Sequence, residues 1–191
     1  MSKLSIIIPV FNEKETIKEI VRQVEAVALP LEKEIIIIDD YSTDGTREIL
    51  KDFNQQQYKI IFREKNGGKG AALRDGFLQS TGEVVIMQDA DLEYDPNDYT
   101  KMETGYKAFR REVVDSFKHR LTSKRFGIEP EITAWVARGR WRVYEVGISY
   151  YGRTYKEGKK INWRDGLAAI WHIIKFNFFY HNRTITPLSF R

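Results

Sequence analysis

The chain has 191 residues, of which 42% are hydrophobic and 30% are charged, and its formal net charge is +4. These values are typical of one globular domain with its own core and argue against extensive disorder. There is no cysteine, which excludes disulfides and cysteine-ligated zinc, and the three histidines match no metal-binding spacing. Any metal is therefore expected to be Mg²⁺ or Mn²⁺ held by oxygen ligands.

The two halves of the chain carry net charges of opposite sign. Residues 1–99 hold 12 basic and 19 acidic side chains, a net charge of −7, and residues 100–191 hold 19 and 8, a net charge of +11. One interpretation is a chance distribution of solvated charges. The other is an acidic, metal-holding half beside a basic half that meets phosphate groups.

Four short apolar runs predict strands that are buried on both faces, as in a parallel sheet: residues 4–8, 34–38, 58–62 and 83–87. Between them, the helical spacing of apolar residues predicts helices over residues 13–28, 44–53 and 69–79. Asn12 is the expected N-cap of the first helix. This alternation predicts an α/β fold with a Rossmann-like, doubly wound and mostly parallel sheet that has helices on both faces.

The second half is less regular. Residues 129–136 have helical spacing, residues 141–150 alternate as a strand does, and residues 165–180 form an amphipathic helical pattern. We therefore divide the chain into a main domain, residues 1–162, and a C-terminal amphipathic helix with its tail, residues 163–191. The first residues lack the features of a signal peptide, and the longest apolar stretch is too short to span a membrane.

The acidic loop that follows the fourth predicted strand is the strongest candidate for chemistry. It carries Asp89, Asp91 and Glu93, and three carboxylates in one short loop repel one another unless a cation lies between them. A divalent cation there would also hold a diphosphate and stabilise the charge of a leaving group. The alternative is a solvated acidic turn at the end of a strand.

The loops after the first and second strands carry further polar residues. Asp39 and Asp40 can accept hydrogen bonds from ribose hydroxyls or a base N–H, while Ser42 or Asp44 caps the next helix. Glu13 either contacts a ligand or is only a favourable acid in the first turn of a helix.

A glycine-rich turn, residues 66–70, opens the third predicted helix. Its amides and Lys69 can face phosphate, although an ordinary tight turn explains the glycines equally well. The turn lacks the Gly-Lys-Ser/Thr ending of a P-loop.

These loops occur in the order in which they occur in a known family. The four segments 6–13, 39–46, 66–70 and 89–91 together resemble the family 2 inverting glycosyltransferases, which have a GT-A fold, and within them the dolichol-phosphate mannosyltransferase-like branch. The resemblance implies a base pocket and a nucleoside site lined by Pro9, Phe11, Glu13, Asp39 and Asp40. It also implies that magnesium or manganese is held by Asp89, Asp91 and Glu93, although many relatives have glutamine at the position of Glu93.

The second half extends the resemblance over residues 102–109, 126–132 and 149–153. In the family, a loop near residue 153 closes over the donor diphosphate, which implies that role for Arg153 and Lys159; a solvated basic hairpin is the alternative. Relatives carry several tens of residues between the acidic loop and the segment that starts at Met102, but here Tyr99 is followed directly by Thr100. Either the chain lacks that stretch or the sequence as printed omits it.

The resemblance implies a metal-dependent enzyme that transfers a hexosyl group, with inversion, from GDP-mannose or a UDP-sugar to a polyprenyl or dolichyl phosphate. Asp91, Arg153 and Lys159 would be its catalytic residues, and Lys69 and Asp89 would contact the donor. The alternatives are a family 2 transferase acting on a glycan hydroxyl and, if the deletion is real, a non-catalytic nucleotide-binding module.

The aromatic and basic residues of the segment 163–180 predict a helix that can lie in a membrane interface. We expect a cytoplasmic protein that is peripheral on the cytoplasmic face of a membrane. Packing of this helix on the core, or a subunit interface in a homo-oligomer, are the alternatives. No nucleic-acid-binding motif is present in the sequence, so we expect no nucleic-acid partner.

Overall fold

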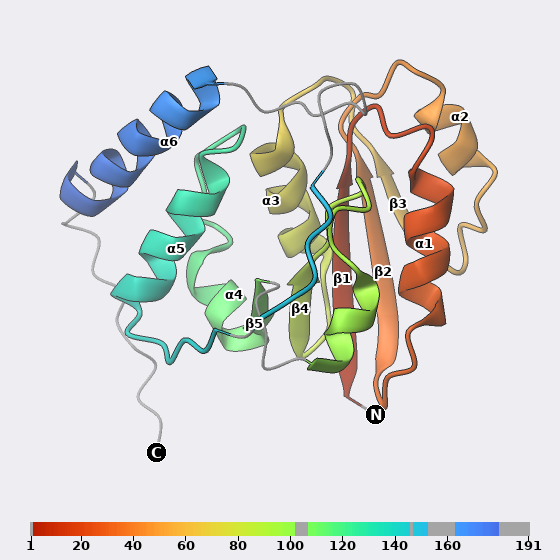
Figure 1. Cartoon of the computed structure of the whole chain (residues 1–191), viewed down its shortest axis with the longest axis horizontal. Helices are drawn as coiled ribbons and strands as arrows, with labels where there is room; N and C mark the ends of the chain where they lie inside the picture. Colours follow the sequence, from red (N-terminus) through yellow and green to blue (C-terminus); the bar gives the residue numbers. More distant parts are fainter. Residues whose placement is uncertain (1, 102–106, 146, 153–162, 180–191) are drawn as a thin grey trace.

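The computed structural model describes residues 2–101, 107–145, 147–152 and 163–179. Its strands are β1 (Lys3–Val10), β2 (Glu32–Asp39), β3 (Lys59–Phe62), β4 (Val84–Met87) and β5 (Ala108–Arg110). They form one sheet in the order β3-β2-β1-β4-β5, parallel except for the antiparallel pairing of β5 with β4 (Figure 1). The predicted α/β fold with a mostly parallel sheet is confirmed, as are its first four strands.

The helices are α1 (Ile17–Ala26), α2 (Thr46–Lys51), α3 (Lys69–Gln79), α4 (Arg111–Phe117), α5 (Ile128–Arg138) and α6 (Trp163–Ile174). A 3-10 helix, η1 (Pro96–Lys101), precedes β5, and a π-helical turn, Lys175–Phe179, follows α6. Helix α1 covers one face of the sheet, and α3, α4 and α5 lie on the other (Figure 1).

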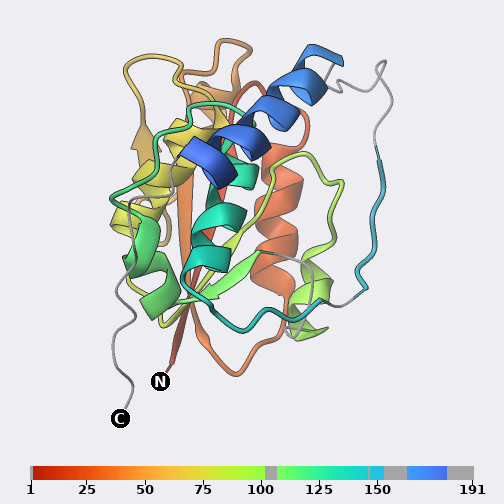
Figure 2. The ribbon, with the colours of Figure 1, turned by 90° about the vertical axis from the view of Figure 1, so that its left-hand side faces the viewer.

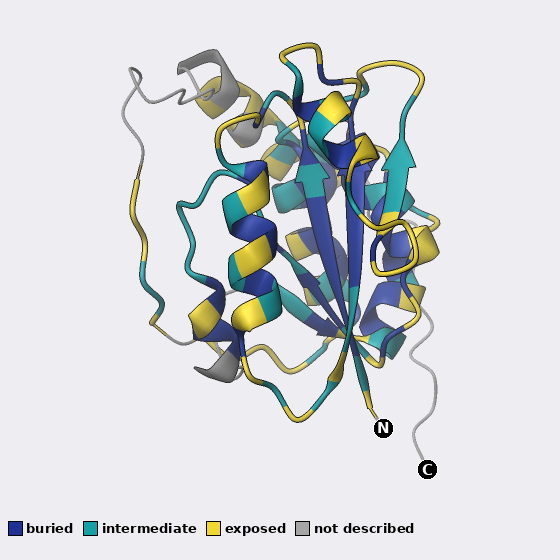
Figure 3. Cartoon of the chain, turned by 90° about the vertical axis from the view of Figure 1, so that its right-hand side faces the viewer, coloured by how far each residue is buried: buried dark blue, intermediate teal, exposed yellow. Residues whose placement is uncertain are grey.

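Alternate residues of the central strands pack into two separate cores, one on each face of the sheet. Ile6 and Ile8 of β1 pack with α1 in the first core, whereas Ile7 packs with α3, α4 and α5 in the second. All three are fully buried, because successive side chains of a strand point to opposite faces and both faces are covered (Figure 3). This arrangement leaves the carboxyl ends of the parallel strands open to build a site.

Two local predictions are wrong. Helix α1 begins at Ile17 with Thr16 as its N-cap, because Asn12 instead adopts a left-handed conformation (φ 54°) and its Oδ1 accepts the N–H of Thr43. The described part of residues 141–150 forms no strand beyond an isolated bridge between Tyr94 and Tyr150. An alternating pattern of polar and apolar side chains does not form a strand unless the backbone of a neighbouring strand is available for hydrogen bonding.

Helix α6 lies against α5 on the outside of the molecule (Figure 2). His172 of α6 lies over Gly127, and its ring stacks on Phe176, a buried residue of the turn that follows α6. Much of the apolar surface of α6 and of this turn stays exposed, notably Leu167, Ile170, Trp171, Ile173, Phe178 and Phe179. Within the described residues, no helix combines the length and the hydrophobicity needed to cross a bilayer.

Candidate functional site

A cleft of about 890 Å³ lies at the carboxyl ends of β1, β2 and β4. Most of the predicted site residues line it together, namely Pro9, Phe11, Glu13, Asp40, Lys69, Asp89, Asp91 and Glu93. Asp39 does not line it, and Arg153 and Lys159 lie outside the described residues. The four loops expected from the sequence therefore contribute to a single cleft.

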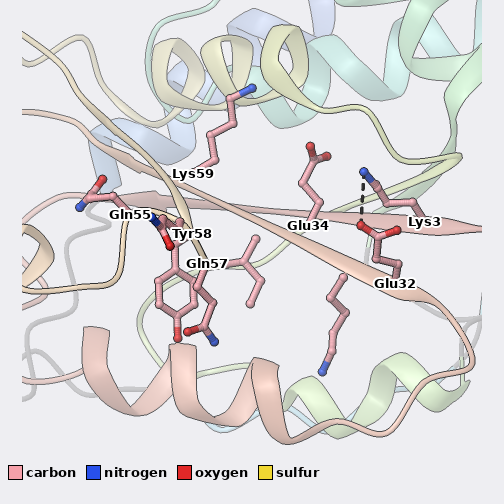
Figure 4. Close-up of a pocket in the computed structure, with 10 residues that line it drawn as sticks. Lys3, Glu32, Glu34, Gln55, Gln57, Tyr58 and Lys59 are labelled. Atoms are coloured by element: carbon pink, nitrogen blue, oxygen red, sulfur yellow. Dashed lines mark ion pairs between the residues drawn. The ribbon is translucent and has the colours of Figure 1, made fainter.

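A smaller hollow of about 290 Å³ lies at the other end of the sheet, where β1, β2 and β3 begin (Figure 4). It is lined by polar side chains, among them Lys3 and Glu32, which form an ion pair of 3.5 Å. Ligands of doubly wound sheets bind at the carboxyl ends of the strands. We therefore assign the functional site to the larger cleft.

The carboxylate of Asp40 accepts hydrogen bonds from the backbone of the glycine-rich turn. Its Oδ1 accepts the N–H of Gly67 at 2.9 Å, its Oδ2 accepts the N–H of Gly68 at 2.6 Å, and it forms an ion pair with Arg63 at 2.5 Å. The expectation that the turn offers these two amides to a phosphate is therefore wrong, since a carboxylate already accepts them. Asp40 is 2% exposed, so it acts mainly by holding the turn at the edge of the cleft.

Asp39 lies behind the cleft and is fully buried. Its Oδ2 accepts the Nε–H of Arg47 at 2.7 Å, and its Oδ1 accepts the N–H of Ser42 at 3.2 Å. Asp40, the next residue, lines the cleft, whereas Asp39 does not. Asp39 instead fixes the loop that follows β2.

Contacts between the first and second loops set the position of Glu13. Its N–H donates to Thr46 Oγ1 at 2.9 Å, and its Oε2 accepts the hydroxyl of Thr16 at 2.8 Å. The N-cap of α2 is Gly45, with no side-chain cap hydrogen bond, so the prediction that Ser42 or Asp44 caps this helix is wrong. Asp44 precedes the N-cap, and its Oδ1 accepts the N–H of Thr46, the first residue of α2, at 3.0 Å. Ser42 instead bridges the loops, because its Oγ accepts the N–H of Asn12.

The three acidic side chains expected to hold a metal point to different partners. Both oxygens of Asp89 contact Lys69 Nζ, at 2.8 and 2.9 Å. Asp91 Oδ1 accepts the N–H of Glu93, and Glu93 Oε2 accepts the hydroxyl of Tyr150 at 3.0 Å. Among the residues that the structure describes, no three His, Cys, Asp or Glu side chains converge on one point. The expected three-carboxylate cluster is thus not assembled in this arrangement.

The chemistry of these residues nevertheless fits a cation. All three offer carboxylate oxygens, which Mg²⁺ and Mn²⁺ prefer, and all three line one cleft. The ammonium of Lys69 already occupies the Asp89 carboxylate and is a stand-in for a positive ion there.

A line of alternating charges continues from the acidic loop into the second half of the chain. Lys69 Nζ also contacts Glu129 Oε1 at 3.1 Å, and the other oxygen of Glu129 pairs with Lys107. The pKa of Lys107 is lowered to about 8, mainly by burial and also by the charge of Lys69, whereas the charge of Asp89 opposes this shift. Sequence reasoning did not identify Glu129 or Lys107, because their proximity to Lys69 arises only from the tertiary fold.

Glu131 was also missed, although the sequence contains a signal for it. It is an acidic residue on the buried face of α5, between Ile128 and Ile132, and it is fully buried. Its carboxylate accepts the N–H groups of Thr122 at 2.8 Å and Ser123 at 2.7 Å, as well as the hydroxyl of Thr122. A buried carboxylate requires such partners, and here they anchor a segment that borders the cleft.

That segment packs directly on the glycine-rich turn. The N–H of Ala71 donates to the carbonyl of Lys124 at 3.2 Å. A Cβ at Gly70 would lie 2.4 Å from the carbonyl oxygen of Ser123, and one at Gly68 would lie 2.5 Å from that of Lys124. Only glycine allows the two backbones to approach so closely, which explains two of the glycines in the turn.

The fold and the cleft define a GT-A-type α/β domain with a site at the carboxyl edge of its sheet. Residues 5–145 match the family described as Glycosyl transferase family 2, and the chain belongs to this family.

Two curated relatives are named for lipid-phosphate substrates. The chain is 33% identical to undecaprenyl-phosphate 4-deoxy-4-formamido-L-arabinose transferase of Pseudomonas savastanoi pv. phaseolicola, over 79% of this chain and 48% of the relative. It is 34% identical to dolichol-phosphate mannosyltransferase of Pyrococcus furiosus, over 52% of this chain and 29% of the relative. The chain therefore spans about half the length of the first relative and less than a third of the second.

A solved structure with a similar fold is the glucosyl-3-phosphoglycerate synthase of Mycobacterium tuberculosis, in complex with Mn²⁺, UDP and phosphoglyceric acid. It has a TM-score of 0.65 and 16% sequence identity, and the match covers 92% of this chain and 78% of that one. This likeness supports the GT-A fold.

Proposed function

We propose that the chain is the catalytic part of a glycosyltransferase that moves a hexosyl group from a nucleoside-diphosphate sugar to a polyprenyl phosphate. The observation that carries this proposal is the single cleft in which the acidic loop, Lys69 and the loops after β1 and β2 meet. The choice of acceptor class rests on the relatives, one named for undecaprenyl phosphate and one for dolichol phosphate.

The donor would lie across the cleft. Phe11, which is 37% exposed, and Glu13 would border the base, and Asp40 would hold the loop under the nucleoside. Lys69 and Arg125, which also line the cleft, would meet the diphosphate, since both are cationic donors suited to phosphate oxygens. Arg153 and Lys159, which lie outside the described residues, would add to this charge.

A divalent cation, Mg²⁺ or Mn²⁺, would be held by Asp89 and Asp91, with Glu93 as a third ligand. When bound, it would neutralise the charge that develops on the departing diphosphate. Lys69 would supply a further positive charge to the same phosphates.

The transfer would be a single in-line displacement at the anomeric carbon. An oxygen of the acceptor phosphate forms the new bond to that carbon while the bond to the donor diphosphate breaks, so the nucleoside diphosphate leaves and the configuration is inverted. A phosphate oxygen is already anionic at neutral pH, and no general base is required. The residues of the cleft therefore act by orienting the donor and by stabilising the leaving group.

The protein would bind its lipid-linked acceptor at a membrane surface. The exposed apolar side chains of α6 and of the turn that follows it form one face of an amphipathic helix, and such faces bind the lipid–water interface. Docking of this face on a bilayer would bring a lipid-linked phosphate to the protein.

A donor-by-acceptor screen tests the proposal. GDP-mannose and a series of UDP-sugars are combined with undecaprenyl phosphate, dolichyl phosphate and free oligosaccharides, with Mn²⁺ or with a chelator. We expect transfer to a polyprenyl phosphate that stops in the chelator. Transfer only to oligosaccharide hydroxyls would contradict the acceptor class, and no transfer or hydrolysis of any donor by folded protein would contradict the catalytic role.

A further inference from the structure

The ion pair between Lys69 and Asp89 lies where the proposed function requires a metal ligand to be available. Both oxygens of Asp89 contact the Lys69 ammonium, at 2.8 and 2.9 Å, and the two side chains are only 19% and 29% exposed. A divalent cation and the ammonium compete for this carboxylate, because Lys69 contacts both of its oxygens and the two positive charges repel each other.

Glu129 is a second ion-pair partner of Lys69. Its Oε1 lies 3.1 Å from Lys69 Nζ, so the ammonium already bridges two carboxylates that come from different parts of the chain. A lysine ammonium has three rotatable donors on a flexible stem, and it can leave one carboxylate while it keeps the other. The pairing of Glu129 with Lys107 holds this second carboxylate in place.

We propose that Lys69 is an internal counter-ion that neutralises Asp89 in the metal-free protein and yields this carboxylate to the divalent cation. Its ammonium then stays on Glu129 and faces the donor diphosphate. The inference rests on the proposed function, because it assigns to Lys69 the step that links metal binding to diphosphate binding. Glu129 is a positioning residue in this account, since it acts through Lys69.

The exchange has consequences of opposite sign for the two residues. Removal of the Lys69 charge removes the competitor for the Asp89 carboxylate. In the absence of nucleotide, the metal should therefore bind more tightly to this variant. Removal of the Glu129 charge takes away the alternative partner, so Lys69 should hold Asp89 more firmly and the metal should bind more weakly. Because binding free energies are reciprocal, Mn²⁺ and a nucleoside diphosphate should also strengthen each other's binding less in the Lys69 variant than in the wild type.

The test is the affinity for Mn²⁺ alone, measured by titration calorimetry or by the electron paramagnetic resonance of free Mn²⁺, without nucleotide. The variants are Lys69→Met and Glu129→Gln, and the control is Lys65→Met, which removes the same charge from an exposed position nearby. We expect Lys69→Met to raise the affinity by about tenfold, because one competing positive charge is removed from the Asp89 carboxylate. Glu129→Gln should lower it severalfold, and Lys65→Met should change it by less than about twofold.

Thermal unfolding supplies a second readout. Without metal, Lys69→Met should unfold at a lower temperature than the wild type, and saturating Mn²⁺ should stabilise it more than it stabilises the wild type. Equal or weaker Mn²⁺ binding by Lys69→Met, relative to Lys65→Met, would overturn the exchange while leaving a Mn²⁺-dependent transfer by the wild type intact. Absence of Mn²⁺ binding by every variant would overturn both the exchange and the proposed metal site.

Discussion

The carboxylate of Glu131 accepts the backbone N–H of Ser123 at 2.7 Å, although neither residue lines the cleft. This bond fixes the segment whose carbonyl groups lie against Gly68 and Gly70. The buried Glu131 of α5 thereby fixes the position of the glycine-rich turn, from which Lys69 reaches Asp89 in the acidic loop. The position of one cleft residue thus depends on a contact made more than fifty residues further along the chain.

Replacement of Glu131 by glutamine should destabilise the protein. The amide has one acceptor oxygen where the carboxylate has two, and its NH₂ group would face a backbone N–H, so at least one buried donor loses its partner. We expect the free energy of unfolding to fall by about 1–3 kcal/mol in urea denaturation. Glu145→Gln, the same change at an exposed position, is the control. Equal stability of the two variants would show that Glu131 does not anchor Ser123.

Replacement of Gly70 by alanine should force the glycine-rich turn away from its neighbour. Alanine favours the helix by up to about 1 kcal/mol, but the added Cβ would lie 2.4 Å from a backbone oxygen, which cannot move alone. We expect a net loss of about 1–2 kcal/mol in the free energy of unfolding. Gly147→Ala is the matched control, since no atom lies within 4 Å of its added Cβ. A neutral Gly70→Ala variant would refute the close approach.

Lys107 should make stability depend on pH on the alkaline side. Its pKa is lowered to about 8 from the ordinary 10.5, mainly by burial. Between these values the folded protein has released the proton while the unfolded chain still holds it, so the free energy of unfolding rises with pH. Relative to Lys107→Met, the wild type should gain on the order of 1 kcal/mol between about pH 7 and pH 10, discounted for solvent screening. Lys59→Met, at an exposed position, is the control and should follow the wild type.

The exposed face of α6 should bind lipid. The double variant Ile170→Ser/Trp171→Ser removes two apolar side chains that are 56% and 57% exposed, so folding is expected to change little. Its affinity for vesicles that contain anionic phospholipid should fall by at least about tenfold in a sedimentation assay. The control is Val143→Ser/Tyr144→Ser, which removes apolar side chains that are 64% and 70% exposed elsewhere. Equal losses in both double variants would argue against a specific role of α6.

Much of the fold followed from local patterns in the sequence. The apolar runs predicted β1 to β4, and the spacing of apolar residues after the glycine-rich turn predicted α3 with the bounds that the structure has. Both signals are local, because they reflect burial on two faces of a sheet or on one side of a helix. The position of the cleft followed in turn from the rule for parallel strand ends.

The pairing of polar side chains did not follow from the sequence. Asn12 has the residue type of an N-cap, yet its Oδ1 is taken by Thr43, thirty-one residues away. The amides of Gly67 and Gly68 are taken by Asp40, and the contacts of Glu129 require the second half of the chain to fold over α3. Such choices depend on the distance between segments in the folded protein, which no local pattern encodes.

The most direct test of the central claim, that the acidic loop serves sugar transfer, is the initial rate of Mn²⁺-dependent transfer to polyprenyl phosphate by Asp91→Asn. The control is Asp52→Asn, the same change at an exposed residue that does not line the cleft. We predict a loss of at least about a hundredfold for Asp91→Asn, with unchanged thermal unfolding, because one of the three proposed metal carboxylates is removed. A rate for Asp91→Asn equal to that of Asp52→Asn under limiting Mn²⁺ would contradict the account.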